Sequence, residues 1–238
     1  MGTFLPPGIL IQDRIFRGLV GWFDFTEPNN TDTRVNSHSV GGGANFVPFI
    51  NPVSRIVAPF GSGYGVNLSG SSLAGGSDEL LFATGTGYAG GDRNWSACIF
   101  AKHLTGAQFA ALVLTDMVGS AYEWQLDMSP GANNAYGYLY YNGASFTTVT
   151  MSPVVTDEWH FLALVHDAQA KTIYGSVDGG NFSSNSYSGT ANTITGQILG
   201  LGAVGDGQAG QFTFHERMLS LAEIQWLYND GNGRAYPG

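Results

Sequence analysis

The alternation of apolar and polar positions is clearest between Glu158 and Gly180, where a short polar turn joins two predicted strands. The first strand is apolar on both faces, of which one carries Trp159, Phe161, Ala163 and Val165 and the other His160, Leu162, Leu164 and His166. A strand of this kind is covered on both sides. Thr172–Val177 returns beside it, and Asp178-Gly179-Gly180 marks the next turn, because glycine accepts positive φ without steric cost.

Shorter runs of the same kind recur along the chain between turn-forming residues. They predict strands over residues 19–25, 64–68, 79–82, 95–102, 109–114, 122–128, 135–141, 198–201 and 211–215. Three prolines between Phe46 and Phe60 restrict that stretch to the edge of a sheet. The pattern predicts an all-β sandwich that forms one domain over residues 19–238.

One short helix is predicted near the C-terminus. Ser220 is an N-cap with Glu223 three residues later, which makes a capping box, and Leu219 and Ile224 sit at the positions of a hydrophobic staple. The apolar face consists of Ile224, Leu227 and Tyr228. Gly231 is the predicted stop.

Composition narrows the class of protein. Glycine supplies 35 of the 238 residues and only 11% of the residues are charged, which suits many strands and tight turns. The net charge is −9 and the basic residues are scattered, so a nucleic-acid partner is not expected. No apolar run reaches membrane-spanning length, and the N-terminus lacks the features of a signal peptide. The single cysteine, Cys98, lies in an apolar strand and is expected to be a buried structural thiol.

Two segments resemble a known family. Residues 158–180, EWHFLALVHD…VDGG, resemble the W-H-x-x-A-L-V-x-D…V-D-G hairpin of the laminin-G-like and pentraxin-like domains. Residues 217–228, RMLSLAEIQWLY, are similar to that family's N-R-A-L-S-x-x-E-I-x-x-L-Y signature, and LVGWFDF and WSACIFAK match two of its strands more loosely. The resemblance covers roughly residues 19–230. It implies a jelly-roll β-sandwich of the concanavalin A-like lectin/glucanase superfamily.

The glucanases of that superfamily carry carboxylates at positions i and i+2 of one strand face. None of the 18 acidic residues forms such a pair here. Glu123 and Asp127 come nearest, but they stand about 13 Å apart along a strand at roughly 3.3 Å per residue. Glycosidase carboxylates are about 5–9.5 Å apart. A cross-strand pair is the alternative, and we expect a protein that is not an enzyme.

Many laminin-G-like domains bind calcium through loop carboxylates, and the candidate ligands here are Asp78, Glu79 and Asp206. Calcium takes about 6–8 oxygen ligands, and no run of the sequence concentrates them. The alternative interpretation is that these three are ordinary turn residues. No other cofactor is expected. His160 and His166 lie too far apart on one strand face to share a metal and are expected to be hydrogen-bonded structural residues.

Three tyrosines, Tyr136, Tyr138 and Tyr140, alternate onto one face of a predicted strand, with Tyr141 on the opposite face. A row of this kind can stack on sugar rings. Packing inside the sandwich and a protein interface are the alternatives, and they are favoured.

Residues 1–18 form an apolar N-terminal arm in which Pro6, Pro7 and Gly8 exclude a helix. The arm is too apolar for a free tail, and its predicted anchors are Phe4, Ile9, Ile11 and Phe16. It is predicted to attach the protein to sister subunits or to a larger particle. The competing interpretation is that it covers an edge of its own sandwich.

The first functional hypothesis is a structural, non-catalytic protein of a bacteriophage virion, either a capsid decoration or a tail-associated protein. It rests on a sandwich that starts at Met1 with an apolar arm and no apparent leader or companion domain. Other virion proteins or sister subunits in a homo-oligomer would then be the partners. The alternative is a carbohydrate-binding or adhesin module of a bacterial surface or secreted protein, with glycans as partners.

Overall fold

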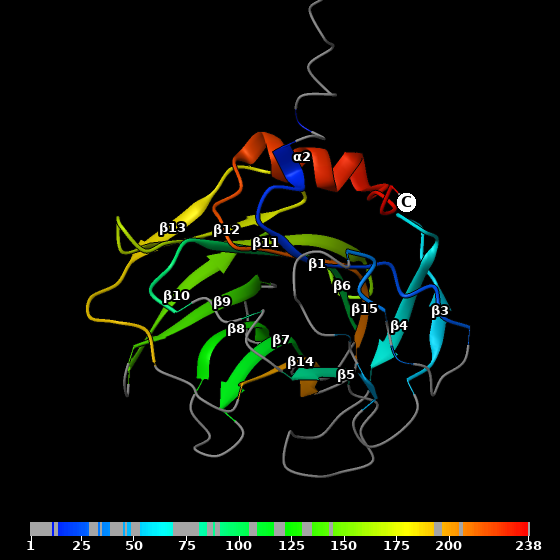
Figure 1. Ribbon diagram of the computed structural model, residues 1–238, viewed down its shortest axis with the longest axis horizontal. Helices are drawn as coiled ribbons and strands as arrows, with labels where there is room; N and C mark the ends of the chain where they lie inside the picture. The colour runs from blue at the N-terminus through cyan, green and yellow to red at the C-terminus, as the bar shows by residue number, and fades with distance from the viewer. Residues whose placement is uncertain are drawn as a thin grey trace, which may run out of the picture.

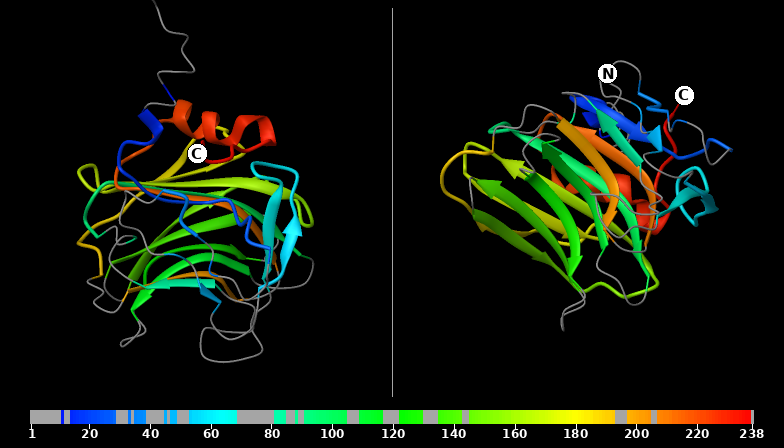
Figure 2. Two further views of the ribbon diagram at one scale, coloured as in Figure 1. Left: turned by 45° about the vertical axis from the view of Figure 1, so that its right-hand side comes forward. Right: turned by 90° about the horizontal axis from the view of Figure 1, so that it is seen from below.

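The computed structural model describes residues 11, 14–28, 33, 35–38, 45, 47–48, 53–68, 81–84, 88, 91–104, 109–116, 122–129, 135–142, 145–192, 197–204 and 207–237. Two antiparallel sheets face one another, and a short helix lies across the outer side of one of them (Figures 1 and 2). The all-β sandwich with one short C-terminal helix is therefore confirmed.

The first sheet has the strand order β13 (Ser183–Ser186), β12 (Thr172–Val177), β11 (Trp159–Asp167), β6 (Trp95–His103), β15 (Gly207–His215), β4 (Tyr64–Leu68) and β3 (Arg55–Val57). A further strand, β1 (Leu19–Phe23), shares the same side of β15 with β4. It pairs with residues 212–215, whereas β4 pairs with residues 207–210. The two strands predicted between Glu158 and Gly180 are β11 and β12, which pair in register from Leu162↔Val177 to Asp167↔Thr172.

The second sheet has the order β10 (Ser145–Met151), β9 (Ala135–Asn142), β8 (Tyr122–Ser129), β7 (Phe109–Asp116), β14 (Gln197–Val204), β5 (Leu81–Thr84) and β2 (Val47–Pro48). The proline-interrupted stretch supplies β2 and β3, and both are edge strands, as its prolines indicate. Strands β10 and β13 were not predicted, because SFTTVTM and SSNS are dominated by serine and threonine rather than by apolar residues.

The main core fills the space between the two sheets. Its aromatic centre is formed by Trp95, Trp124 and Phe214, whose rings pack with centroids 5.0 to 6.3 Å apart. Leu162 and Leu164 of β11 belong to this core and are fully buried. The predicted assignment of the two faces of β11 is therefore correct on this side.

A second core lies on the opposite face of the first sheet, where helix α2 (Leu221–Tyr228) covers β11 and β6 (Figure 1). Its buried members include Phe161, Ala163 and Val165 of β11 together with Ile224 and Leu227 of the helix. The predicted capping box is present. The helix ends at Asn229, which adopts the left-handed conformation at φ 50° and is followed by a 3₁₀ turn, η2 (Asn229–Gly231), so the stop predicted at Gly231 comes two residues too late.

The N-terminal segment joins this second core. Ile11, Arg14 and Ile15 are helical, so the expectation that the arm contains no helix is wrong for its second half, which lies beyond Pro6, Pro7 and Gly8. Ile15 is fully buried, and the ring of Phe16 packs on Trp22 and Tyr236 at centroid distances of 6.3 and 5.8 Å. At Phe16 the arm therefore packs against its own sandwich, as the competing interpretation has it. Ile11 is half-buried. The anchors Phe4 and Ile9 lie outside the described residues.

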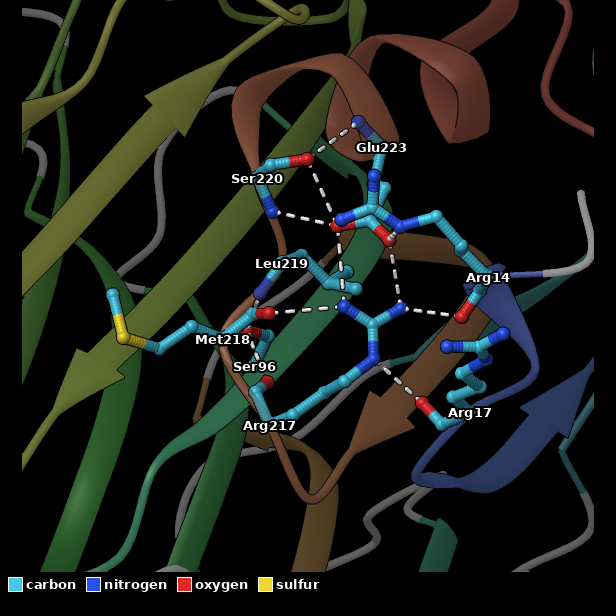
Figure 3. A network of polar contacts seen from close by, with 8 residues as sticks. All are labelled: Arg14, Arg17, Ser96, Arg217, Met218, Leu219, Ser220 and Glu223. Atoms are coloured by element: carbon cyan, nitrogen blue, oxygen red, sulfur yellow. Dashed lines mark hydrogen bonds and ion pairs between the residues drawn. The ribbon is translucent and has the colours of Figure 1, made fainter. Parts of the chain in front are cut away.

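Arg217 connects the N-terminal segment to the helix through hydrogen bonds (Figure 3). Its guanidinium donates to the backbone oxygens of Arg14 (2.7 Å) and Arg17 (2.6 Å). The same group holds the carboxylate of Glu223 at 2.9 and 3.1 Å, and that carboxylate also accepts from Ser220. The partly buried Arg217–Glu223 ion pair thus links residues 14–17 to the start of α2. Among the described residues, no helix is long and apolar enough to cross a membrane.

Candidate ligand-binding surface

The alternation of β9 decides which tyrosines face the core. Tyr136, Tyr138 and Tyr140 point between the sheets and are at most 1% exposed. Tyr140 stacks on His166 at 4.6 Å and packs on Tyr187 at 4.5 Å. The three predicted glycan or interface candidates are therefore core residues, because the face that they share is the one covered by the first sheet. Of the alternatives, packing inside the sandwich is correct.

The opposite face of the second sheet carries its own aromatic row, formed by Tyr122 of β8, Tyr141 of β9 and Phe146 of β10. The rings of Tyr122 and Tyr141 lie 5.3 Å apart, and those of Tyr141 and Phe146 lie 5.6 Å apart. Phe146 is directly paired with Tyr141 and keeps 57% of its surface exposed. Three aromatic side chains from adjacent strands thus form one row at the surface.

A β-bulge brings Tyr122 into this row. The register between β7 and β8 shifts between the pairs Leu114↔Trp124 and Thr115↔Tyr122, so Glu123 is the extra residue of β8. A bulge changes the direction in which neighbouring side chains point. Glu123 is accordingly buried and accepts a hydrogen bond from the backbone N–H of Gly91, while Tyr122 contacts Tyr141.

Polar side chains continue from the aromatic row along β8. The hydroxyl of Tyr141 donates to Oε1 of Gln125 (3.2 Å), and Nε2 of Gln125 donates to Oδ2 of Asp127 (3.0 Å). Burial raises the pKa of Asp127, and the bond from Gln125 opposes that shift. The chain of hydrogen bonds fixes the orientation of the Gln125 amide, and among the described residues no hydrogen bond reaches the second carboxylate oxygen of Asp127, which can act as an acceptor.

The neighbouring positions on this face are small. Asp127 pairs with Gly137 of β9, and Gly137 pairs in turn with Thr150 of β10. A Cβ built on Gly137 would lie 3.3 Å from Cδ1 of Leu139 and 3.7 Å from Cγ2 of Thr148. The space beside Asp127 is therefore shallow and is bordered by the side chains of Leu139 and Thr148.

The segment 187–192 supports the end of the row. Asn192 donates from its side chain to the backbone oxygen of Tyr122 (2.6 Å) and from its backbone to that of Tyr141 (3.3 Å). At Ala191 the backbone N–H donates to Asp92 (3.2 Å), which pairs with Lys171 at 3.3 Å. The segment thus ties the first sheet to the two strands that carry Tyr122 and Tyr141.

Glu123 and Asp127, the acidic pair considered in the sequence, do not form a glycosidase pair. Asp127 lies on the outer face of the second sheet, whereas Glu123 is buried close enough to Tyr138 and Tyr140 to raise the pKa of each. Burial also raises the pKa of the Cys98 thiol to about 12, which removes its nucleophilic form at neutral pH.

The two histidines of β11 are structural. Nδ1 of His160 lies 2.8 Å from Oδ2 of Asp178, and its Nε2 accepts from the backbone of Val155. The ring nitrogens of His166 bond the backbone oxygen of Arg93 and the hydroxyl of Tyr187, each at 2.7 Å.

Within the described part of the chain, no group of three His, Cys, Asp or Glu side chains could hold a metal ion. The calcium candidates Asp78, Glu79 and Asp206 lie outside the described residues. Calcium binding by those three residues stays a prediction.

The sequence pattern placed Tyr141 on the face opposite the other three tyrosines but predicted no role for it. It did not predict that Tyr122 and Phe146 lie beside Tyr141. The available signal was the alternation of SFTTVTM, which puts Phe146 opposite Val149 and Met151. The bulge at Glu123 leaves no comparable mark in the sequence.

No protein-family model and no curated protein sequence matches the chain. Solved structures with a similar fold include the binding domain of Paraclostridial Mosquitocidal Protein 1 (TM-score 0.66, 11% identity) and that of Botulinum Neurotoxin DC in complex with SialylT (TM-score 0.67, 12% identity). They cover 93% and 90% of this chain, which spans only 53% and 52% of theirs. Trypanosoma rangeli sialidase matches 91% of the chain over 33% of its own length, with a TM-score of 0.62 and 14% identity. At these identities the likeness establishes the fold alone: a β-sandwich like those in toxin binding domains and in a sialidase.

Proposed function

We propose that the protein is a non-catalytic carbohydrate-binding module and that the aromatic row is its binding surface. The observation that carries the proposal is the placement of Tyr122, Tyr141 and Phe146 side by side on an outer sheet face, with hydrogen-bonding groups directly beside them. Aromatic rings offer a flat apolar surface to the C–H face of a sugar ring, and Tyr retains a polar edge. Gln125 and Asp127 add the few placed polar groups that orient a ligand.

The structural neighbours support the proposal at the level of the fold. One is a toxin binding domain in complex with SialylT, and another is a sialidase in complex with sialic acid. Because the identities are 12% and 13%, no ligand residue is carried over from either protein. The position of the row on the outer face of the second sheet comes from this chain alone.

A place in a bacteriophage virion and assembly with sister subunits stay predictions. They rest on the apolar arm, whose residues Ile15 and Phe16 are engaged by the sandwich itself. A glycan-binding module on a virion or on a bacterial surface would use the same aromatic row. The proposed binding activity therefore does not depend on the location.

Retention by polysaccharides during electrophoresis tests the proposal. The purified protein is run by affinity electrophoresis through gels that contain soluble polysaccharides, alongside Tyr141→Ala and Phe146→Ala. Each variant is expected to weaken binding about tenfold, which corresponds to a loss of about 1.4 kcal/mol. The matched control is Val57→Ala, which removes an 85% exposed apolar side chain from β3 in the other sheet. Equal retention of the two aromatic variants and the wild type, or no retention of any of them, would overturn the proposal.

A further inference from the structure

The outer face of the second sheet has no positive charge on the strands that carry the aromatic row. Strands β8, β9 and β10 contain no Lys, Arg or His. Their only carboxylic acids are Glu123, which is buried on the other side, and Asp127, which lies on this face beside Gln125. Lys171, on the turn between β11 and β12, is paired with Asp92. A ligand on the aromatic row therefore meets a negative carboxylate and no countercharge from these strands.

In the chain of hydrogen bonds from Tyr141 through Gln125 to Asp127, the groups left over are mainly acceptors. The Tyr141 hydroxyl uses its hydrogen on Gln125, and the Gln125 amide uses one of its two hydrogens on Asp127. What remains on this chain of groups is a carboxylate oxygen, the phenol oxygen and a single amide hydrogen. Sugar hydroxyls donate to such acceptors, and a bond to a carboxylate is of the stronger, charge-assisted kind. A ligand carboxylate is itself only an acceptor and would face Asp127.

The shape of the row adds a second restriction. The planes of Tyr122 and Tyr141 are tilted by 36° and those of Tyr141 and Phe146 by 50°, so the row turns from strand to strand and offers no single flat plane. A twisted row fits one oligosaccharide chain, whose rings change orientation along the chain, better than the flat face of a crystalline polysaccharide. Gly137 adds no side chain beside Asp127, and the hydroxyls of that chain would fit into the shallow space bordered by Leu139 and Thr148.

We propose that the surface takes single chains of neutral, hydroxyl-rich oligosaccharides and discriminates against glycans that carry sialic acid or uronic acid. The proposal rests on the carbohydrate-binding function proposed above and names its ligand class. It separates this chain from the neighbours whose complexes contain sialylated or sialic acid ligands. Asp127 is the specificity-determining residue, because it accepts from the hydroxyls and repels a carboxylate.

Isothermal titration at pH 7 and physiological salt tests the ligand class. The probes are cellohexaose, xylohexaose, mannohexaose and lactose as neutral ligands, and polygalacturonate oligomers and sialyllactose as acidic ones. The best neutral ligand is expected to bind at least tenfold more tightly than any acidic ligand. Lactose and sialyllactose form a matched pair that differs only in the sialic acid.

Two variants locate the discrimination. Asp127→Asn is expected to weaken binding of the neutral ligand about tenfold and to bring the affinities for lactose and sialyllactose within about threefold of one another. Glu158→Gln removes the same charge from an exposed site between β10 and β11 and is expected to change neither. Gly137→Thr keeps a residue that suits a strand but fills the space beside Asp127, so it is expected to abolish binding with an unchanged urea midpoint.

The outcomes distinguish this inference from the function on which it rests. Acidic ligands that bind as tightly as neutral ones, with binding still lost in Tyr141→Ala, would overturn the ligand class and leave the binding function standing. Unchanged discrimination in Asp127→Asn would equally overturn it. If no glycan binds, the proposed function itself is wrong.

Discussion

Acid is expected to weaken the fold through His215, the last residue of β15. The side chain is fully buried, and it faces the second core, where Arg217, Glu223 and His38 influence its charge. Neither ring nitrogen makes a full hydrogen bond within the described part of the chain, and the Ile15 backbone gives only a small contribution in favour of the charged form. Burial, followed by repulsion from Arg217, lowers the pKa of His215 from 6.5 to about 3.

The direction of the effect follows from proton linkage. The unfolded chain binds a proton at this histidine below about pH 6.5, whereas the folded chain resists protonation until about pH 3, so the stabilising contribution is complete above pH 6.5 and falls as the pH drops towards 3. Each pH unit in that window costs about 1.4 kcal/mol of the free energy of unfolding, which gives about 2 kcal/mol between pH 6.5 and 5. Glu223 does not titrate between pH 6.5 and 5. Burial would raise its pKa, but hydrogen bonds from Arg217 and Ser220 outweigh burial and lower the pKa from 4.5.

Urea denaturation at pH 7.5 and pH 5.0 measures this contribution. His215→Leu has a similar volume and cannot be protonated, so its loss of stability between the two pH values is expected to be smaller than that of the wild type by about 2 kcal/mol. Other buried histidines with lowered pKa, such as His166, remain in both proteins and cancel in the difference. An equal loss in the two proteins would refute the argument.

Three further predictions concern the packing around the helix. Arg217→Met leaves the carboxylate of Glu223, whose side chain is 2% exposed, with only the exposed Arg14 at 3.9 Å as a cation. It is expected to destabilise the protein by about 3–5 kcal/mol and to open the Arg14 and Arg17 bonds to trypsin. Arg93→Met, in an exposed pair, is expected to cost at most about 1 kcal/mol in the same urea titration. Trp159→Ala is expected to lower the free energy of unfolding by about 2–3 kcal/mol in urea melts. This is less than the roughly 3–5 kcal/mol typical of a fully buried Trp, because the ring packs on Phe60 but is only partly buried. A loss below about 1 kcal/mol would contradict that packing. Deletion of residues 2–17 removes Ile15 and Phe16 and is expected to lower the urea midpoint, whereas deletion of residues 2–10 leaves both in place. If the shorter deletion keeps the fold but abolishes self-association in sedimentation, the arm is an attachment segment. If self-association is unchanged, that hypothesis is wrong.

Local signals predicted much of the fold. The capping box at Ser220 and Glu223 lies within four residues, and the β11–β12 hairpin needs only its own alternation and turn, so both could be found from short stretches of sequence. Strand β10 escaped because its threonines give little apolar contrast, and the attachment of Ile15 escaped because it depends on Arg217, about 200 residues away. Contacts of that separation are not encoded in any local pattern.

The candidate surface was not predicted for a different reason, which is that the sequence does not show which of the two faces of β9 is covered by the other sheet. Alternation shows that Tyr136, Tyr138 and Tyr140 share a face, but it does not say which face is covered. Packing supplies the missing criterion. The interior between two sheets is filled to a density without large voids, so the face with more side-chain volume is the better candidate for the covered one. On β9 that is the face with three tyrosines, and the face with Gly137 is left for the outside. Tyr141 lies on the same face as Gly137 and is therefore the tyrosine that a ligand can reach.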